Sequence, residues 1–142
     1  MSTIDFTLSA TVATSYDATV ARVRDLLGDA GFGVLTEIDL TATLRAKLGV
    51  DIPQQVILGA CMPQLAHRAL EADPRIATML PCNVVVAAEG EETRVEVFDP
   101  AAMTSFSSDA GVAEVAADAR QRLTGMLEAL TGEKKDDDAA RA

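Results

Sequence analysis

The chain has 142 residues, 49% of them apolar, and this length is typical of a single domain that buries its own hydrophobic core. The net charge of −10 argues against nucleic acids and anionic lipid surfaces as partners, because binding them depends mainly on clustered lysine and arginine. No apolar run approaches the about 20 residues of a membrane-spanning helix, and the N-terminus lacks the pattern of a signal peptide. We therefore expect a cytoplasmic protein.

The first part of the chain predicts a strand followed by a helix. Apolar and polar residues alternate over Ile4–Leu8, as they do in a strand with one buried face. Ser15 can cap the N-terminus of an amphipathic helix whose apolar residues recur at steps of three and four. Gly31 is a natural stop for this helix.

A second strand and a short helix are expected next. Residues 32–40 predict the strand, with Phe32, Val34, Thr36 and Ile38 on one face. Asp39 or Thr41 can cap a short helix that Gly49 closes.

The middle of the chain predicts an interior strand, two helices and a hairpin. The apolar run at 54–61 indicates the interior strand. Pro63 suits the first position of a helix that reaches Ala72, and Asp73-Pro74 begins a second short helix. Residues 82–88 and 93–99 then predict two strands joined by a turn at Gly90.

The C-terminal part predicts one long helix from Asp109 to Gly132, because its apolar residues keep to one face. The charged residues 133–142 are expected to be a disordered tail, so that residues 1–132 form the single domain. This order of elements predicts a two-layer α+β fold, with helices packed on one face of a mixed or antiparallel sheet.

The segment "GACMPQLAHRAL", Gly59 to Leu70, contains the strongest candidate site. Cys61 precedes a helix N-terminus, where exposed backbone N–H groups can lower the pKa of a thiol. His67 is the only histidine, and Glu71 lies four residues further on, within reach of a hydrogen bond. Cys82 lies beside Cys61 only if the chain returns antiparallel through the break at Asp73-Pro74, and the sequence leaves both topologies open.

Two interpretations of Cys61, His67 and Cys82 follow. They can form a thiol or metal site, with water as the fourth ligand of a zinc ion, for redox or ligand-transfer chemistry. The alternative, which we favour, is that both cysteines are buried small hydrophobes and His67 is a surface residue.

Glu37 and Asp39 share a strand face and can act as an acid–base pair, although a solvated face explains them as well.

Three strings of this sequence resemble a known family: "GFGVLTEIDLTATLRAKLGVD", "ILGACMPQLAHRALEADPRIATMLPCNVVV" and "VEVFDPAAM". They are similar to the bacterial and archaeal domain of unknown function numbered 302, and the resemblance covers about residues 20–103. It implies a two-layer α+β domain akin to the TATA-box-binding-protein-like fold, without DNA binding. It assigns no activity, cofactor or site residue.

The favoured hypothesis is a non-catalytic homodimer that binds a small ligand or a protein partner. It is motivated by the missing catalytic constellation and by the ample apolar faces of the predicted helices. The alternative function is the thiol or metal site built from Cys61, His67 and Cys82.

Overall fold

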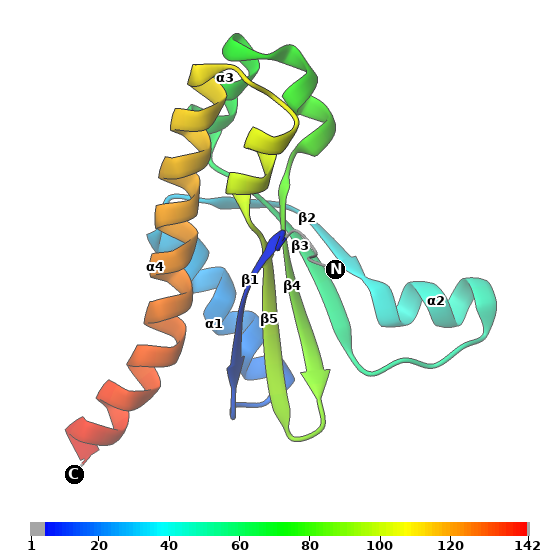
Figure 1. The fold of residues 1–142 in the computed structure, drawn as a ribbon. Coiled ribbons are helices and arrows are strands. Elements are labelled where there is room, and N and C mark those ends of the chain that lie inside the picture. Colours follow the sequence, from blue (N-terminus) through cyan, green and yellow to red (C-terminus); the bar gives the residue numbers. More distant parts are fainter. Residues whose placement is uncertain (1–4, 142) are drawn as a thin grey trace.

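The computed structural model describes the backbone of residues 5–141 and the side chains of residues 5–132. Its centre is a five-stranded sheet in the order β1-β5-β4-β3-β2, antiparallel at every pairing (Figure 1). The strands are β1 (Thr7–Val12), β2 (Gly33–Asp39), β3 (Gln55–Cys61), β4 (Cys82–Glu89) and β5 (Glu92–Phe98). The helices are α1 (Tyr16–Asp29), α2 (Leu40–Leu48), α3 (Pro63–Ala72) and α4 (Ala110–Arg141), with 3-10 helices η1 (Pro74–Met79) and η2 (Pro100–Ser105).

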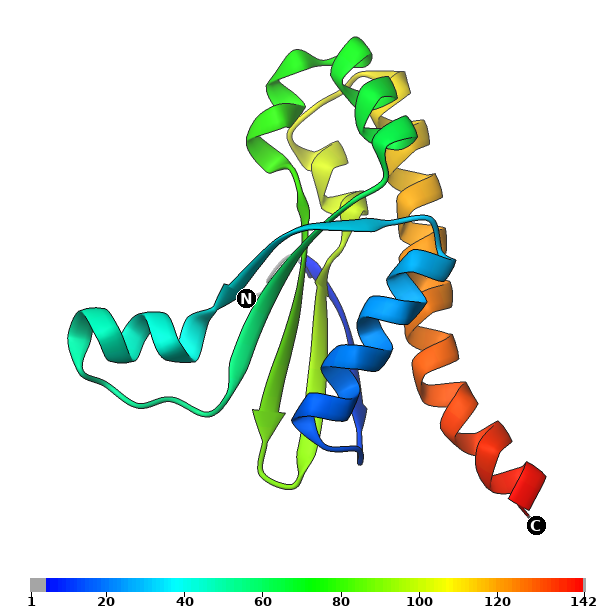
Figure 2. The same ribbon diagram turned by 180° about the vertical axis from the view of Figure 1, so that it is seen from behind.

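Helices α1 and α4 cover one face of the sheet, so the predicted α+β fold is confirmed (Figure 2). Strands β3, β4 and β5 contribute alternate residues to the core between the two layers, as a sheet with one buried face requires. The residues of this main core are Val12, Val23, Leu26, Leu27, Phe32, Val56, Leu58, Ala60, Cys82, Val84, Val86, Val95, Val97, Leu123, Met126, Leu127 and Leu130.

A second core lies beyond one end of the sheet, where α3, η1 and η2 pack against the first turns of α4 (Figure 1). The chain passes from β3 through α3 and η1 and returns as β4, antiparallel to β3. The second core comprises Leu65, Ala69, Ile76, Met103, Val112, Val115, Ala116 and Ala119. It holds both 3-10 helices at this end of the sheet.

Short polar side chains cap α1, α2 and both 3-10 helices, and the caps at Ser15, Asp39 and Asp73 agree with the predicted helix starts. The Ser15 hydroxyl accepts a hydrogen bond from the backbone N–H of Ala18, at 3.2 Å, and Asp39 accepts one from Ala42, at 2.9 Å. Asp73 and Asp99 each cap a 3-10 helix that starts with proline. These bonds satisfy backbone donors that the first turn leaves without a partner.

Both outer strands differ from their predicted form. The first strand is Thr7–Val12 rather than 4–8, because its pairing with β5 runs from Thr7↔Phe98 to Val12↔Thr93. In β2 the register with β3 shifts between Val34 and Thr36, which adds one residue on the β2 side. A one-residue shift reverses the side-chain faces. Val34 therefore packs on the main core while Ile38 is 45% exposed, and the predicted single face is wrong.

Helix α4 continues to Arg141, beyond its predicted end at Gly132. The side chains of residues 133–142 lie outside the described ones, and the disorder expected there stays a prediction. Within the described residues, no helix combines the length and the hydropathy needed to cross a membrane.

Candidate functional site

The structure brings the two cysteines to the same end of the sheet. Ala60 of β3 pairs with Cys82 of β4, so Cys61 and Cys82 close neighbouring ends of two adjacent strands. Both line a cavity of about 30 Å³ whose other walls are apolar, among them Leu65, Ala69 and Met103. A cavity of this size has room for about one water molecule and for no organic ligand.

Burial disfavours the reactive thiolate form of both cysteines. Removal from water raises the pKa of Cys61, and it raises the pKa of Cys82 to about 11, with a smaller contribution from the neighbouring Cys61. Cys61 is half-buried and Cys82 is buried, and neither forms a disulfide. The helix N-terminus at Pro63 therefore does not produce the lowered thiol pKa that a reactive cysteine needs.

His67 does not join the cysteines in a common site. Its side chain is 75% exposed on α3, and its Nδ1 lies 3.5 Å from the Glu71 carboxylate, the neighbour that the sequence predicts. His67 is not among the residues around the cysteine cavity. Among residues 5–132, no group of three or more His, Cys, Asp and Glu side chains is placed to hold a metal ion.

Glu37 and Asp39 have separate structural partners. The Glu37 carboxylate accepts a hydrogen bond from Arg24 of α1 at 2.8 Å, and both side chains are partly exposed. Asp39 caps α2. Their arrangement agrees with a solvated strand face.

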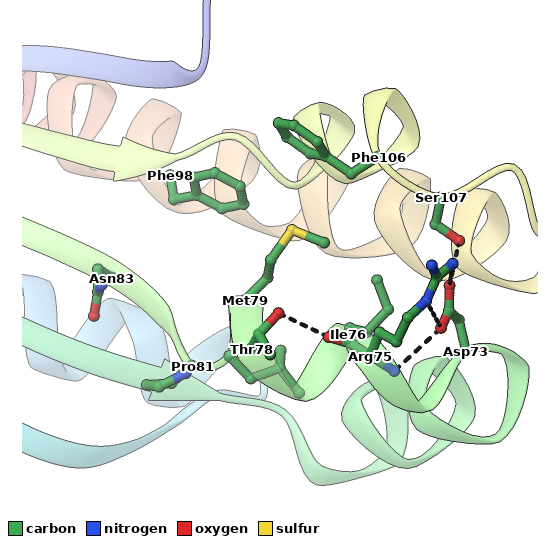
Figure 3. Close-up of a pocket in the computed structure, with 11 residues that line it drawn as sticks. Asp73, Arg75, Ile76, Thr78, Met79, Pro81, Asn83, Phe98, Phe106 and Ser107 are labelled. Atoms are coloured by element: carbon green, nitrogen blue, oxygen red, sulfur yellow. Dashed lines mark hydrogen bonds and ion pairs between the residues drawn. The ribbon is translucent and has the colours of Figure 1, made fainter.

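A larger hollow lies on the other side of the second core, between η1 and the end of η2 (Figure 3). We call it the η1–η2 cleft. Its volume is about 640 Å³, within the range of about 300–1,000 Å³ that is usual for small-molecule sites. Most of its lining is apolar, contributed by Ile76, Met79, Leu80, Pro81, Phe98 and Phe106.

Pro81 lines the cleft and lies close to the backbone of β3 at Gly59. Gly59 of β3 lies beneath it, and a Cβ added at Gly59 would collide with the Thr36 side chain and stand 2.8 Å from Cγ of Pro81. Only glycine leaves room for both neighbours in this arrangement.

One end of the cleft is polar and tightly bonded. Arg75 donates to Asp73 through Nε, at 3.0 Å, and through Nη2, at 2.9 Å, which makes a bidentate pair (Figure 3). The Ser107 hydroxyl donates to the same carboxylate at 2.9 Å. These bonds hold the pKa of Asp73 well below its usual range. Asp73 is 8% exposed, whereas the Arg75 side chain is 80% exposed.

No catalytic or ligand-binding motif in the sequence marks this cleft. Asp73-Pro74 predicts only the start of a short helix, and in the structure Asp73 and Asp99 both cap 3-10 helices. The lining residues come from two segments, 73–83 and 98–107, which the turn of the β4–β5 hairpin separates in the sequence. The two Asp-Pro pairs, each starting a short helix, were the available signal.

Comparison with known proteins agrees with the predicted resemblance. The model of the family described as "Domain of unknown function DUF302" matches residues 8–130. A crystal structure of an uncharacterized conserved DUF302 protein from Bacillus stearothermophilus is similar, with 33% sequence identity and a TM-score of 0.80. The match covers 87% of this chain and 96% of that chain. No curated protein matches. Since the family model spans most of the sequence and a solved relative shares the fold, the chain belongs to the DUF302 family of domains of unknown function.

Proposed function

We propose that this protein is a non-catalytic, homodimeric binding domain whose ligand occupies the η1–η2 cleft. The ligand class that fits is a small molecule with an apolar body and one hydrogen-bonding group. The observation that carries the proposal is the cleft itself, which combines a mostly apolar lining with the bonded Asp73, Arg75 and Ser107 at one end; Thr78 and Asn83 are the other polar residues of its wall.

The polar end favours a neutral ligand over an anion. The positive charge of Arg75 is already compensated by Asp73, at 2.9 Å, and the chain as a whole carries −10. An added anion would meet this net repulsion, whereas a hydroxyl or amide gains hydrogen bonds without it. The exposed guanidinium of Arg75 remains available as a donor at the mouth of the cleft.

The bonding around Asp73 supports a binding role rather than catalysis. A general base works best when its pKa lies near the working pH, and Asp73 is held far below that range. The Ser107 hydroxyl donates to this weakly basic carboxylate, an arrangement that orients the hydroxyl without activating it as a nucleophile. The raised pKa values of Cys61 and Cys82 give the thiol alternative no support.

We also infer that this is a bacterial protein, that it is located in the cytoplasm and that it has no nucleic-acid partner. Two unpaired cysteines fit a reducing compartment, and the net charge of −10 opposes association with polyanions.

Truncating Phe106 should weaken binding to the cleft. Phe106 lines the cleft and is 73% exposed, so Phe106→Ala removes an aromatic wall without opening either core. We expect its affinity for N-phenylnaphthylamine, a neutral apolar fluorophore with one N–H group, to fall about threefold to tenfold. Fluorescence titration measures the affinity of each variant.

Phe6→Ala is the matched control, because Phe6 is 60% exposed and does not line the cleft. It should bind the fluorophore as the wild type does. If the wild type fails to bind, or if Phe106→Ala and Phe6→Ala bind alike, the cleft is not the ligand site.

A further inference from the structure

The segment 33–54 extends from the body of the protein and has no core of its own. It comprises β2, α2 and the connection to β3, and we call it the arm (Figures 1 and 2). Helix α2 contains no buried residue, and six of the seven residues of β2 are exposed. Of the six large hydrophobic side chains exposed within residues 5–132, four lie on the arm: Leu35, Ile38, Leu48 and Val50.

The arm is nevertheless well bonded internally. Asp39 caps the start of α2, and Gly49, with φ of +68°, ends it in the left-handed conformation. Arg45 donates to Asp51 at 2.8 Å, and the Thr41 hydroxyl accepts from the Gln55 backbone N–H at 2.8 Å. Isolated helices shorter than about 12–15 residues are marginal in water. A nine-residue helix with this many local bonds and no buried face is suited to packing on a partner.

The arm also includes an open edge of the sheet. Strand β2 is the last strand in the order, so one side of its backbone has no neighbouring strand. It contains neither proline nor lysine, and its bulge, another feature that disfavours pairing at an edge, is confined to residues 34–36 and leaves residues 36–39 in regular register. An extended strand of another chain can therefore continue the sheet there.

Most of the net negative charge lies outside the arm, so a contact made through the arms keeps the two charged bodies apart. Three acidic and two basic residues leave the arm at −1, and the remaining residues carry the other −9. Two copies of the protein repel each other over most of their surfaces, and this repulsion is weakest where the two arms meet. A second copy is also the one partner that always presents a matching edge strand and the same apolar side chains.

We propose that the arm is the homodimer interface, with the two β2 strands pairing antiparallel across a two-fold axis. Leu35 and Ile38 would be buried near the strand contact, and Leu48 and Val50 would pack on the partner. A stable interface has about 20–30 residues on each side, and the exposed residues of the arm would form the centre of such a surface. This inference rests on the dimerisation proposed above and specifies its surface.

Charge substitutions on the arm test the interface. Leu35 is 65% exposed and Ile38 is 45% exposed, so Leu35→Lys and Ile38→Lys leave both cores intact. In a dimer each would bury a charge, and we expect the dimer dissociation constant to rise about tenfold or more. Sedimentation velocity over a concentration series measures it, and circular dichroism verifies that each variant is folded.

Phe6→Lys makes the same change of charge on an exposed side chain outside the arm, and it should dimerise as the wild type does. If the wild type dimerises and both folded arm variants dimerise equally well, the interface lies elsewhere and only this inference fails. A wild type that stays monomeric at all concentrations overturns both the interface and the proposed homodimer. The titration of the cleft is independent of either result.

Discussion

Replacing Ile76 with alanine should lower the free energy of unfolding by about 3 kcal/mol, because it removes a fully buried side chain from a packed core. Ile76 is 1% exposed, belongs to the second core and also lines the η1–η2 cleft. The cavity left behind would loosen η1, which carries Arg75 and Met79 in the cleft wall. Urea unfolding followed by circular dichroism measures the change.

The control for Ile76 is Phe6→Ala, which should change the unfolding free energy by less than about 0.5 kcal/mol. Phe6 is 60% exposed and belongs to neither core. Equal effects of the two substitutions would show that the second core does not hold η1 in place. Ile76→Ala should also weaken binding of N-phenylnaphthylamine, since the cleft depends on the position of η1.

Alkaline pH should destabilise the protein through Cys82. Burial raises the pKa of this thiol from 9.0 to about 11. Between these two pH values the folded state keeps the thiol proton, whereas the unfolded state releases it. The stabilisation is fully present below the unfolded pKa, and it is lost as the pH rises through the folded pKa. The loss attributable to Cys82 should reach about 2–3 kcal/mol across this interval.

Urea unfolding at several pH values between about pH 9 and pH 11 measures this decline. Other groups titrate in the same interval, Tyr16 among them, because burial raises its pKa also. The comparison is therefore with Cys82→Ala, whose stability should start lower and fall less steeply. Parallel curves for the two proteins would mean that Cys82 is accessible to water, which would reopen the thiol alternative.

Local signals in the sequence predicted most of the helices well. Ser15, Asp39 and Asp73 each cap the helix that follows, as their sequence neighbourhood predicts. The short helix η2, which Asp99 caps, was not predicted. Pro63 stands at the first position of α3. These features depend on neighbours in the sequence and need no knowledge of the rest of the fold.

Features that depend on strand pairing could not be predicted in the same way. The bulge at Leu35 in β2 becomes visible only in the register with β3, and it is the reason that Ile38 is exposed. The proximity of Cys61 and Cys82 required the antiparallel return from β3 to β4, one of two topologies that the sequence allowed. The bounds of β1 likewise depend on its pairing with β5, which runs to Val12, beyond the predicted end of the strand at Leu8.

The site was harder to predict than the fold, because the cleft joins two distant segments. Arg75 and Met79 come from the connection between β3 and β4, whereas Phe98 ends β5 and Phe106 and Ser107 follow it. Each segment contributes both apolar and polar residues, and only the folded chain brings the two segments together. The cysteines and the histidine predicted a candidate site, but in the structure the residues around Cys61 and Cys82 are apolar.

The most direct test of ligand binding in the η1–η2 cleft is chemical-shift mapping with octanol, which has an apolar body and one hydroxyl. Nitrogen-15 spectra of the labelled wild type are recorded as octanol is added up to its solubility limit. The proposal predicts saturable shifts at Arg75, Met79, Asn83, Phe106 and Ser107, which line the cleft. Saturable shifts confined to other surfaces, or no shifts at all, would contradict it.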